Sequence, residues 1–118
     1  PGRTVLAANE IVVEIRVPPP ERGAADAYQR LIPRSEMDIA VVGVGACLTM
    51  DADGRCVDAH VALGAVGPRA FLANDAAAHL VGKPIDEATL AKAGALAAEA
   101  ARPISDKRGT AEYRREIT

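Results

Sequence analysis

The chain has 118 residues, a formal net charge of −2 and an aromatic content of 3%. This length suits one domain with a single hydrophobic core, which valine, leucine, isoleucine and alanine must build because aromatic residues are scarce. The slightly negative charge gives no general attraction to nucleic acid or to an anionic membrane surface, and no apolar run reaches the roughly 20 residues that span a bilayer.

Two segments in the first third of the chain have the composition of β-strands. Residues 10–17, EIVVEIRV, are rich in β-branched side chains and end at Pro18, which has no amide proton to continue a ladder. Residues 27–32, AYQRLI, alternate weakly and are closed by Pro33. The sequence therefore predicts a first strand at 10–17 and a second at 27–32.

The stretch 38–48, DIAVVGVGACL, has glycines spaced like part of a dinucleotide-binding fingerprint, but the third glycine is absent. A turn sequence follows at Asp53-Gly54, close to where the fingerprint would need a helix. A two-residue turn there pairs Val44 with Leu63 and makes one face of the ribbon apolar throughout. We therefore predict a β-hairpin over residues 39–66, whose glycines allow backbone approach or a bend.

In this predicted hairpin Met50 faces Val57, and on the other face Cys47 faces His60. Cys56 then lies about 13 Å along the sheet from Cys47, which is too far for a disulfide. Two free thiols fit a reducing cytoplasm. No second pair with metal-ligand spacing accompanies Cys47 and His60, so we predict no metal site.

The second half of the chain carries helix signals. Asn74 is a good N-cap for the short helix DAAAHLV, and Gly82 stands at its C-terminal cap position. Asp86 caps a longer helix over residues 87–101, and Thr110 opens a third at AEYRREIT. Strands followed by helices predict an α+β fold, with an antiparallel three- to four-stranded sheet and about three helices packed on one face.

No catalytic residue is identified, because neither histidine has a nucleophile and an orienting carboxylate placed around it. One charged cluster, formed by Arg30, Arg34, Glu36 and Asp38, precedes the hairpin. It is either a solvated loop or a place that presents an arginine and a carboxylate to a polar ligand.

A second cluster, formed by Arg108, Arg114 and Arg115 around Tyr113, lies at the C-terminal end of the chain. It is either an exposed helix face with ion pairs or a docking helix for another domain or subunit. The spacing does not separate the two interpretations.

Four motifs in a fixed order carry a family resemblance. They are R-x-x-x-D-I-A from Arg34, L-G-x-V-x-P from Leu63, L-x-G-K-x-x-D from Leu80 and D-x-R-G-x-A-E-Y-R-R from Asp106. Together they resemble the C-terminal domain of the FAD-binding medium subunit of molybdenum hydroxylases, a group that includes carbon monoxide dehydrogenase and xanthine dehydrogenase. The resemblance implies that residues 1–118 are a single domain, the C-terminal domain of a longer FAD-binding subunit.

The resemblance also implies a function. The subunit would pass electrons from iron-sulfur clusters through FAD to an external acceptor, as part of a cytoplasmic oxidoreductase. The FAD would be bound mainly by N-terminal domains of the same subunit, and the molybdenum cofactor and iron-sulfur clusters would lie on partner subunits. The isolated domain would then be inactive. The alternative is a non-catalytic docking module that uses the Arg-rich C-terminal helix.

Carried over by position, the residues that the resemblance places at the flavin are Arg30, Arg34, Asp38, Ile39 and Ala40. The arginines would tune the flavin potential, and the two apolar residues would contact the ring. Xanthine dehydrogenases have a further acidic residue where Met37 stands, which favours a quinone or another acceptor over NAD. Tyr28 matches an aromatic position of the same segment, to which we assign no role.

Overall fold

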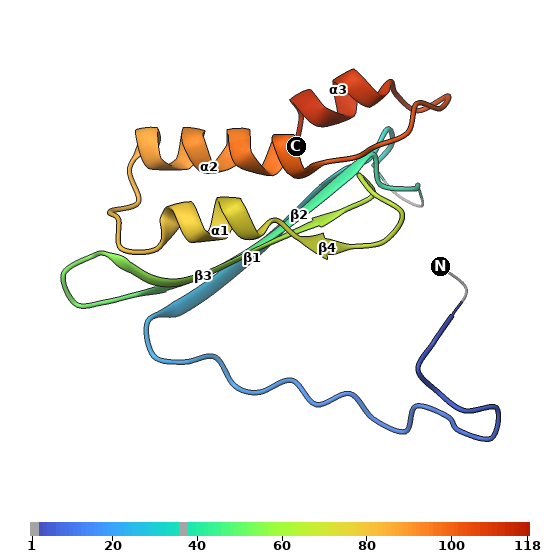
Figure 1. The fold of residues 1–118 in the computed structure, drawn as a ribbon, viewed down its shortest axis with the longest axis horizontal. Coiled ribbons are helices and arrows are strands. Elements are labelled where there is room, and N and C mark those ends of the chain that lie inside the picture. The colour runs from blue at the N-terminus through green and yellow to red at the C-terminus, as the bar shows by residue number, and fades with distance from the viewer. Residues whose placement is uncertain (1–2, 36–37) are drawn as a thin grey trace.

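The computed structural model describes residues 3–35 and 38–118. Four antiparallel strands form one sheet in the order β1-β2-β3-β4, and three helices lie on one side of it (Figure 1). The elements are β1 Ala24–Leu31, β2 Val42–Met50, β3 Cys56–Gly64, β4 Phe71–Leu72, α1 Asn74–Leu80, α2 Glu87–Ala100 and α3 Ala111–Glu116. The predicted α+β architecture is confirmed. No helix within the described ranges is long and apolar enough to cross a membrane.

The β2–β3 hairpin has the predicted register over most of its length. Val44 pairs with Leu63, and Cys47 pairs with His60. Both cysteines are free thiols. The register was predictable because an alternating strand has only one pairing that puts its apolar side chains on the same face as those of its neighbour.

The turn of this hairpin differs from the prediction. The amide of Asp51 donates to the carbonyl of Arg55 at 2.9 Å, which leaves a three-residue loop with Gly54 at a φ of 75°. Met50 therefore pairs with Cys56 and not with Val57, and a register shift follows between Thr49 and Met50. The predicted two-residue turn and the Met50 pairing were wrong. The loop is one residue longer than predicted, and the β-bulge beside it restores the predicted pairing from Thr49 onward.

The glycines of β2 let an aromatic ring approach the backbone. A Cβ atom built on Gly43 would lie 2.6 Å from the hydroxyl oxygen of Tyr28, and one on Gly45 would lie 3.8 Å from its ring. Tyr28 reaches them from the neighbouring strand β1, where it pairs with Gly45. This agrees with the prediction that these glycines serve close approach, and here the approaching group is a side chain.

The core lies between the sheet and the helices and is made of small and aliphatic side chains. Helix α1 packs against β3, and α2 packs against α1. The buried apolar residues are Val41, Val42, Cys56, Ala59, Val61, Leu63, Val66, Ala73, Ala76, Leu80, Ala93, Ala97 and Ala101. The many alanines allow helices and sheet to pack closely, as the composition predicted.

Helix α1 begins at Asn74, one residue before the start that an Asn74 cap predicts. Ala73 is the N-cap and makes no side-chain bond, while Asn74 already belongs to the helix, so the predicted Asn74 cap was wrong. The chain after α1 is fastened to β3. The amide of Gly82 donates to the carbonyl of Cys56 at 2.7 Å, and the amide of Cys56 donates to the carbonyl of Lys83 at 2.9 Å.

The starts of α2 and α3 follow the sequence prediction. The carboxylate of Asp86 accepts from the amide of Thr89 at 2.8 Å, and the hydroxyl of Thr110 accepts from the amide of Tyr113 at 3.1 Å. Side-chain caps of this kind satisfy amides that have no partner within the helix. Helix α2 ends one residue before the predicted boundary.

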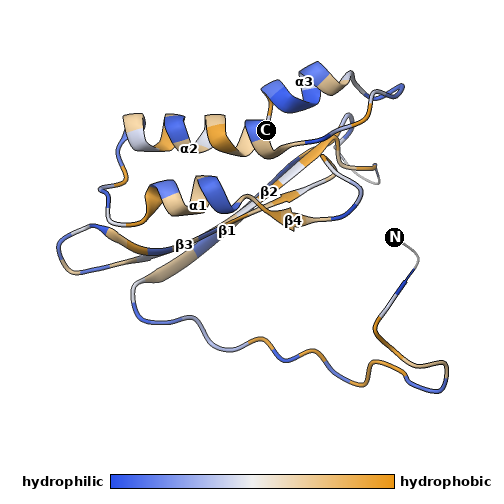
Figure 2. Cartoon of the chain, in the orientation of Figure 1, coloured by the Kyte–Doolittle hydropathy of each residue, from blue (hydrophilic) through white to orange (hydrophobic). Residues whose placement is uncertain are grey.

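The predicted first strand at 10–17 was wrong. These residues belong to no strand, and residues 3–22 run well away from the sheet (Figure 1). Figure 2 shows apolar positions along this segment that lie apart from the core. The β-branched composition reports a preference for extended backbone, but a strand also needs a neighbour. The second predicted strand is confirmed as β1, which begins three residues earlier than expected.

Candidate functional site

The loop between β1 and β2 holds four of the five residues that the family resemblance places at a flavin. They are Arg34, Asp38, Ile39 and Ala40. Pro33 follows the end of β1, and the amide of Val41 donates to the carbonyl of Leu31 at 2.8 Å, which closes the loop at its base. The short closed loop brings these side chains to one end of the sheet.

An ion pair orders this loop. Arg34 Nε lies 3.3 Å from Asp38 Oδ2, and the amide of Ile39 donates to Asp38 Oδ1 at 2.7 Å. A second guanidinium comes from far along the chain, because Arg108 Nε lies 3.5 Å from Asp38 Oδ1. The Ile39 amide, followed by Arg34 and Arg108, lowers the pKa of Asp38, so its carboxylate is ionised at neutral pH.

The fifth predicted site residue, Arg30, lies on β1 opposite Gly43 and is exposed. It therefore flanks the loop from the strand and is not one of the loop residues around Asp38. Glu36 of the predicted charged cluster and Met37, which bears on the choice of electron acceptor, lie outside the described residues.

The C-terminal arginine cluster separates into three different environments. Arg108 reaches Asp38, whereas Arg115 is exposed on α3. Arg114 is only 4% exposed, and it donates to the carbonyl of Val41 at 2.9 Å and to Asp106 Oδ1 at 2.6 Å. Arg114 therefore fastens α3 to the start of β2, and this buried side chain is not available for docking another protein.

Sequence reasoning missed this meeting of the two arginine clusters. Arg108 and Asp38 are distant in the chain, and no local spacing predicts a contact over such a separation. The one available signal was that R-x-x-x-D-I-A and D-x-R-G-x-A-E-Y-R-R both belong to the same ordered set of motifs. Their shared contact gives a physical reason for both motifs.

The loop also borders a cavity of about 390 Å³. Ile39 and Ala40 line it together with Pro68, Ile104 and the buried Arg114. Ile39 is 64% exposed and Ile104 is 72% exposed, so apolar side chains stand open beside the ion pair. This end of the domain thus combines an apolar surface with guanidinium groups.

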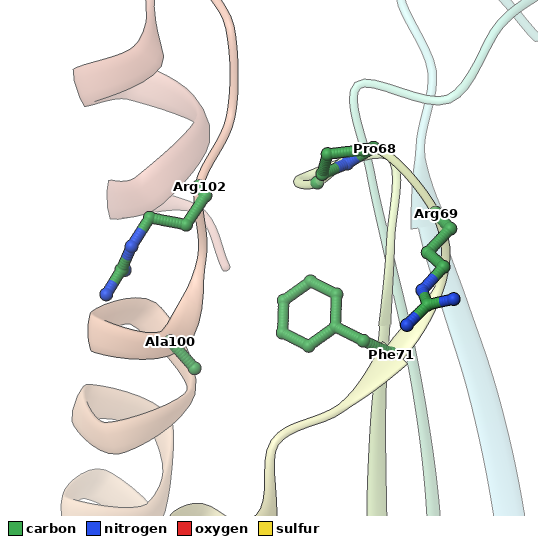
Figure 3. Close-up of a pocket in the computed structure, with 6 residues that line it drawn as sticks. Pro68, Arg69, Phe71, Ala100 and Arg102 are labelled. Carbon is green, nitrogen blue, oxygen red and sulfur yellow. The ribbon is translucent and has the colours of Figure 1, made fainter. Parts of the chain in front are cut away.

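A second cavity of about 410 Å³ lies between the β3–β4 connection and the end of α2. Figure 3 shows the Phe71 ring pointing across it toward Ala100, with Pro68 at its rim. It shares Gly67, Pro68 and Arg102 with the first cavity, but none of the predicted site residues lines it. We assign no ligand to it.

The side chains of the loop before β2 have the chemistry that one wall of a flavin site requires. An isoalloxazine ring needs apolar contact for its faces and hydrogen-bond donors or positive charge near its carbonyl edge. The exposed Ile39 and the guanidinium of Arg34 have these properties. The described ranges contain no set of three or more histidine, cysteine, aspartate or glutamate side chains that could hold a metal ion.

Comparisons with known proteins identify the family of this chain. The model of the family described as the CO dehydrogenase flavoprotein C-terminal domain matches residues 27–118. The carbon monoxide dehydrogenase medium chain of Afipia carboxidovorans is 38% identical over 114 residues, which are 97% of this chain and 39% of that protein.

Two solved structures share the fold and much of the sequence. Carbon monoxide dehydrogenase from Hydrogenophaga pseudoflava, which lacks the Mo-pyranopterin moiety of its molybdenum cofactor, has a TM-score of 0.88 at 32% identity, over 98% of this chain and 39% of that chain. Quinoline 2-oxidoreductase from Pseudomonas putida 86 has a TM-score of 0.74 at 41% identity, over 80% of this chain and 32% of that chain. The chain thus spans at most about two fifths of the length of these relatives.

Proposed function

Because this chain belongs to the CO dehydrogenase flavoprotein C-terminal domain family, we propose that it is the C-terminal domain of the FAD-binding subunit of a molybdenum hydroxylase. Its relatives are parts of oxidoreductases, and the matched family is a flavoprotein family. The observation that carries the proposal is the closed loop before β2, where Arg34, Asp38 and Ile39 form an ordered wall with both polar and apolar parts.

In this proposal the domain closes against the flavin ring, with most of the cofactor held by preceding domains of the same subunit. Bound FAD would supply electron transfer, taking electrons from iron-sulfur clusters on partner subunits and passing them to an external acceptor. Ile39 and Ala40 provide apolar contact and exclude water from the ring. Arg34 and Arg30 bring positive charge to the ring edge, and Asp38 holds Arg34 in place.

The replacement Arg34→Ala in the full-length subunit tests this arrangement. Reduction adds negative charge to a flavin, which a nearby guanidinium stabilises, so the variant should have a lower midpoint potential. A shift of about 30 mV corresponds to about 1.4 kcal/mol for a two-electron couple. Spectroelectrochemical titration of the purified subunit measures the potential, and its FAD content is determined on the same sample.

Arg22→Ala is the matched control, because Arg22 precedes the opposite end of β1 and its removal changes the net charge equally. The control should keep the potential of the unmodified subunit. Equal potentials in all three proteins would exclude Arg34 from tuning the flavin. A full-length subunit that binds no FAD would overturn the proposed function itself.

A further inference from the structure

The segment 10–17 exposes an unusual amount of aliphatic surface. Its exposed side chains are Ile11 at 81%, Val12 at 62%, Val13 at 87%, Ile15 at 84% and Val17 at 83%. Five exposed aliphatic side chains so close together are seldom left in water, and they indicate a surface that another element covers.

The order of residues in the segment is that of a strand with one buried face. Ile11, Val13 and Ile15 are two residues apart, so in extended backbone they point the same way, and the opposite face carries Val12 together with charged side chains. Glu14 and Arg16 point the other way and form an ion pair, with Arg16 Nη2 at 2.6 Å from Glu14 Oε1. One face suits a hydrophobic core, and the other suits solvent.

The sheet of this chain does not take the segment up. The recorded strand pairs of the described residues join only β1 to β2, β2 to β3 and β3 to β4. The three prolines at 18–20 stop a ladder from continuing into β1. At Gly23, which has a φ of 85°, the chain turns into the sheet, and the Gly23 carbonyl accepts from the amide of Met50 at 3.0 Å.

The comparison with the Hydrogenophaga structure bears on what surrounds the segment. That match covers 98% of this chain, so it includes the segment and its detached course. The same match covers only 39% of the solved chain, so that chain contains further protein beyond the matched part. The matched family is described as a C-terminal domain, so in a member of the family the remaining length precedes it.

We propose that residues 10–17 form a strand of a β-sheet in the preceding part of the same subunit, with Ile11, Val13, Ile15 and Val17 facing the core of that part. This inference rests on the proposed function, because it requires the longer subunit. The prolines at 18–20 then form a stiff junction between that sheet and β1. The strand sets the direction from which the loop with Arg34 and Asp38 approaches the rest of the subunit.

Hydrogen exchange followed by mass spectrometry tests the proposal in two samples, the 118-residue chain alone and the full-length subunit. Amides of residues 10–17 should exchange within seconds in the chain alone and about 100-fold more slowly in the subunit. Equal exchange in both samples would overturn the proposal. Protection in the chain alone would also overturn it, because the segment would then pair within these residues, for example at the free edge of β1.

Two substitutions on opposite faces of the segment provide a second readout. In the full-length subunit, Ile15→Asn should lower the unfolding temperature by about 5 °C, whereas Glu14→Gln should leave it unchanged. In the 118-residue chain neither variant should change it. Equal effects of the two variants in the subunit would contradict the assigned faces.

The FAD content of the same subunit preparation separates this inference from the proposed function. A subunit that binds FAD but leaves residues 10–17 unprotected contradicts the strand proposal alone. A subunit that protects these residues but binds no FAD contradicts the proposed function alone.

Discussion

Single residues at the site end of the domain carry strain and charge that can be tested. Ala65 has a φ of 64°, in the left-handed region that costs a residue with a Cβ atom roughly 1–2 kcal/mol. It follows β3 and lines the cavity that Ile39 borders. The strain is therefore located beside the proposed flavin wall, and it is removable without touching a proposed flavin contact.

We expect Ala65→Gly to raise the free energy of unfolding by about 0.5–1 kcal/mol, since relief of the strain exceeds the added entropy of a glycine in the unfolded chain. Ala70→Gly is the control, because Ala70 lies nearby with an ordinary φ and should lose a little stability. Urea unfolding of both variants measures the difference. A loss of stability in Ala65→Gly would show that this backbone conformation is not strained.

The carboxylate of Asp106 makes the stability of the domain depend on pH. The amide of Arg108 donates to it at 2.8 Å and the Arg114 guanidinium at 2.6 Å, and these contacts lower its pKa in the folded state. A lowered pKa gives stabilisation that is complete above the unfolded value near 4 and is lost as the pH falls through the folded value.

The urea midpoint should therefore fall as the pH is lowered from about 5 to about 3, and it should fall less steeply in Asp106→Asn. Asp38 and Asp86, whose pKa values are also lowered, should contribute to the decline that remains in the variant. Parallel curves for the variant and the unmodified chain would remove Asp106 from this role.

At the scale of elements, the attachment of α3 depends on Arg114. Arg114→Met keeps much of the side-chain volume but leaves the carbonyl of Val41 without its buried donor, which costs about 1–3 kcal/mol. Arg115→Met, one residue further along the same helix, changes the charge equally and should stay within about 0.5 kcal/mol of the unmodified chain. Chemical unfolding of the two variants checks this, and equal losses would contradict the anchoring role of Arg114.

The sequence predicted elements well where their signals are local. The alternation around Val44 and Leu63 determined the hairpin register, and Asp86 and Thr110 marked helix starts because their side chains bond amides three residues away. The strand predicted at 10–17 failed because its composition says nothing about a partner. The contact of Arg108 with Asp38 was not predictable from local spacing, since it depends on how distant segments fold together.

At the scale of the whole molecule, the chain is a sheet with helices on one side and a detached apolar segment before it (Figure 1). The family resemblance anticipated the α+β architecture and the family to which the chain belongs. It did not anticipate the course of residues 3–22, which we propose is determined by the preceding part of the subunit. The open end with Arg34 and the detached segment are the two regions through which we expect the domain to meet the rest of its subunit.

Val41 connects the site to the C-terminal helix. Its amide holds the base of the loop by bonding Leu31, its carbonyl accepts from Arg114, and its side chain is almost fully buried. The loop therefore cannot swing open while α3 stays docked without breaking one of these bonds. Loop and helix are therefore coupled, and thermal fluctuations that release α3 would also release the loop that we propose faces the flavin.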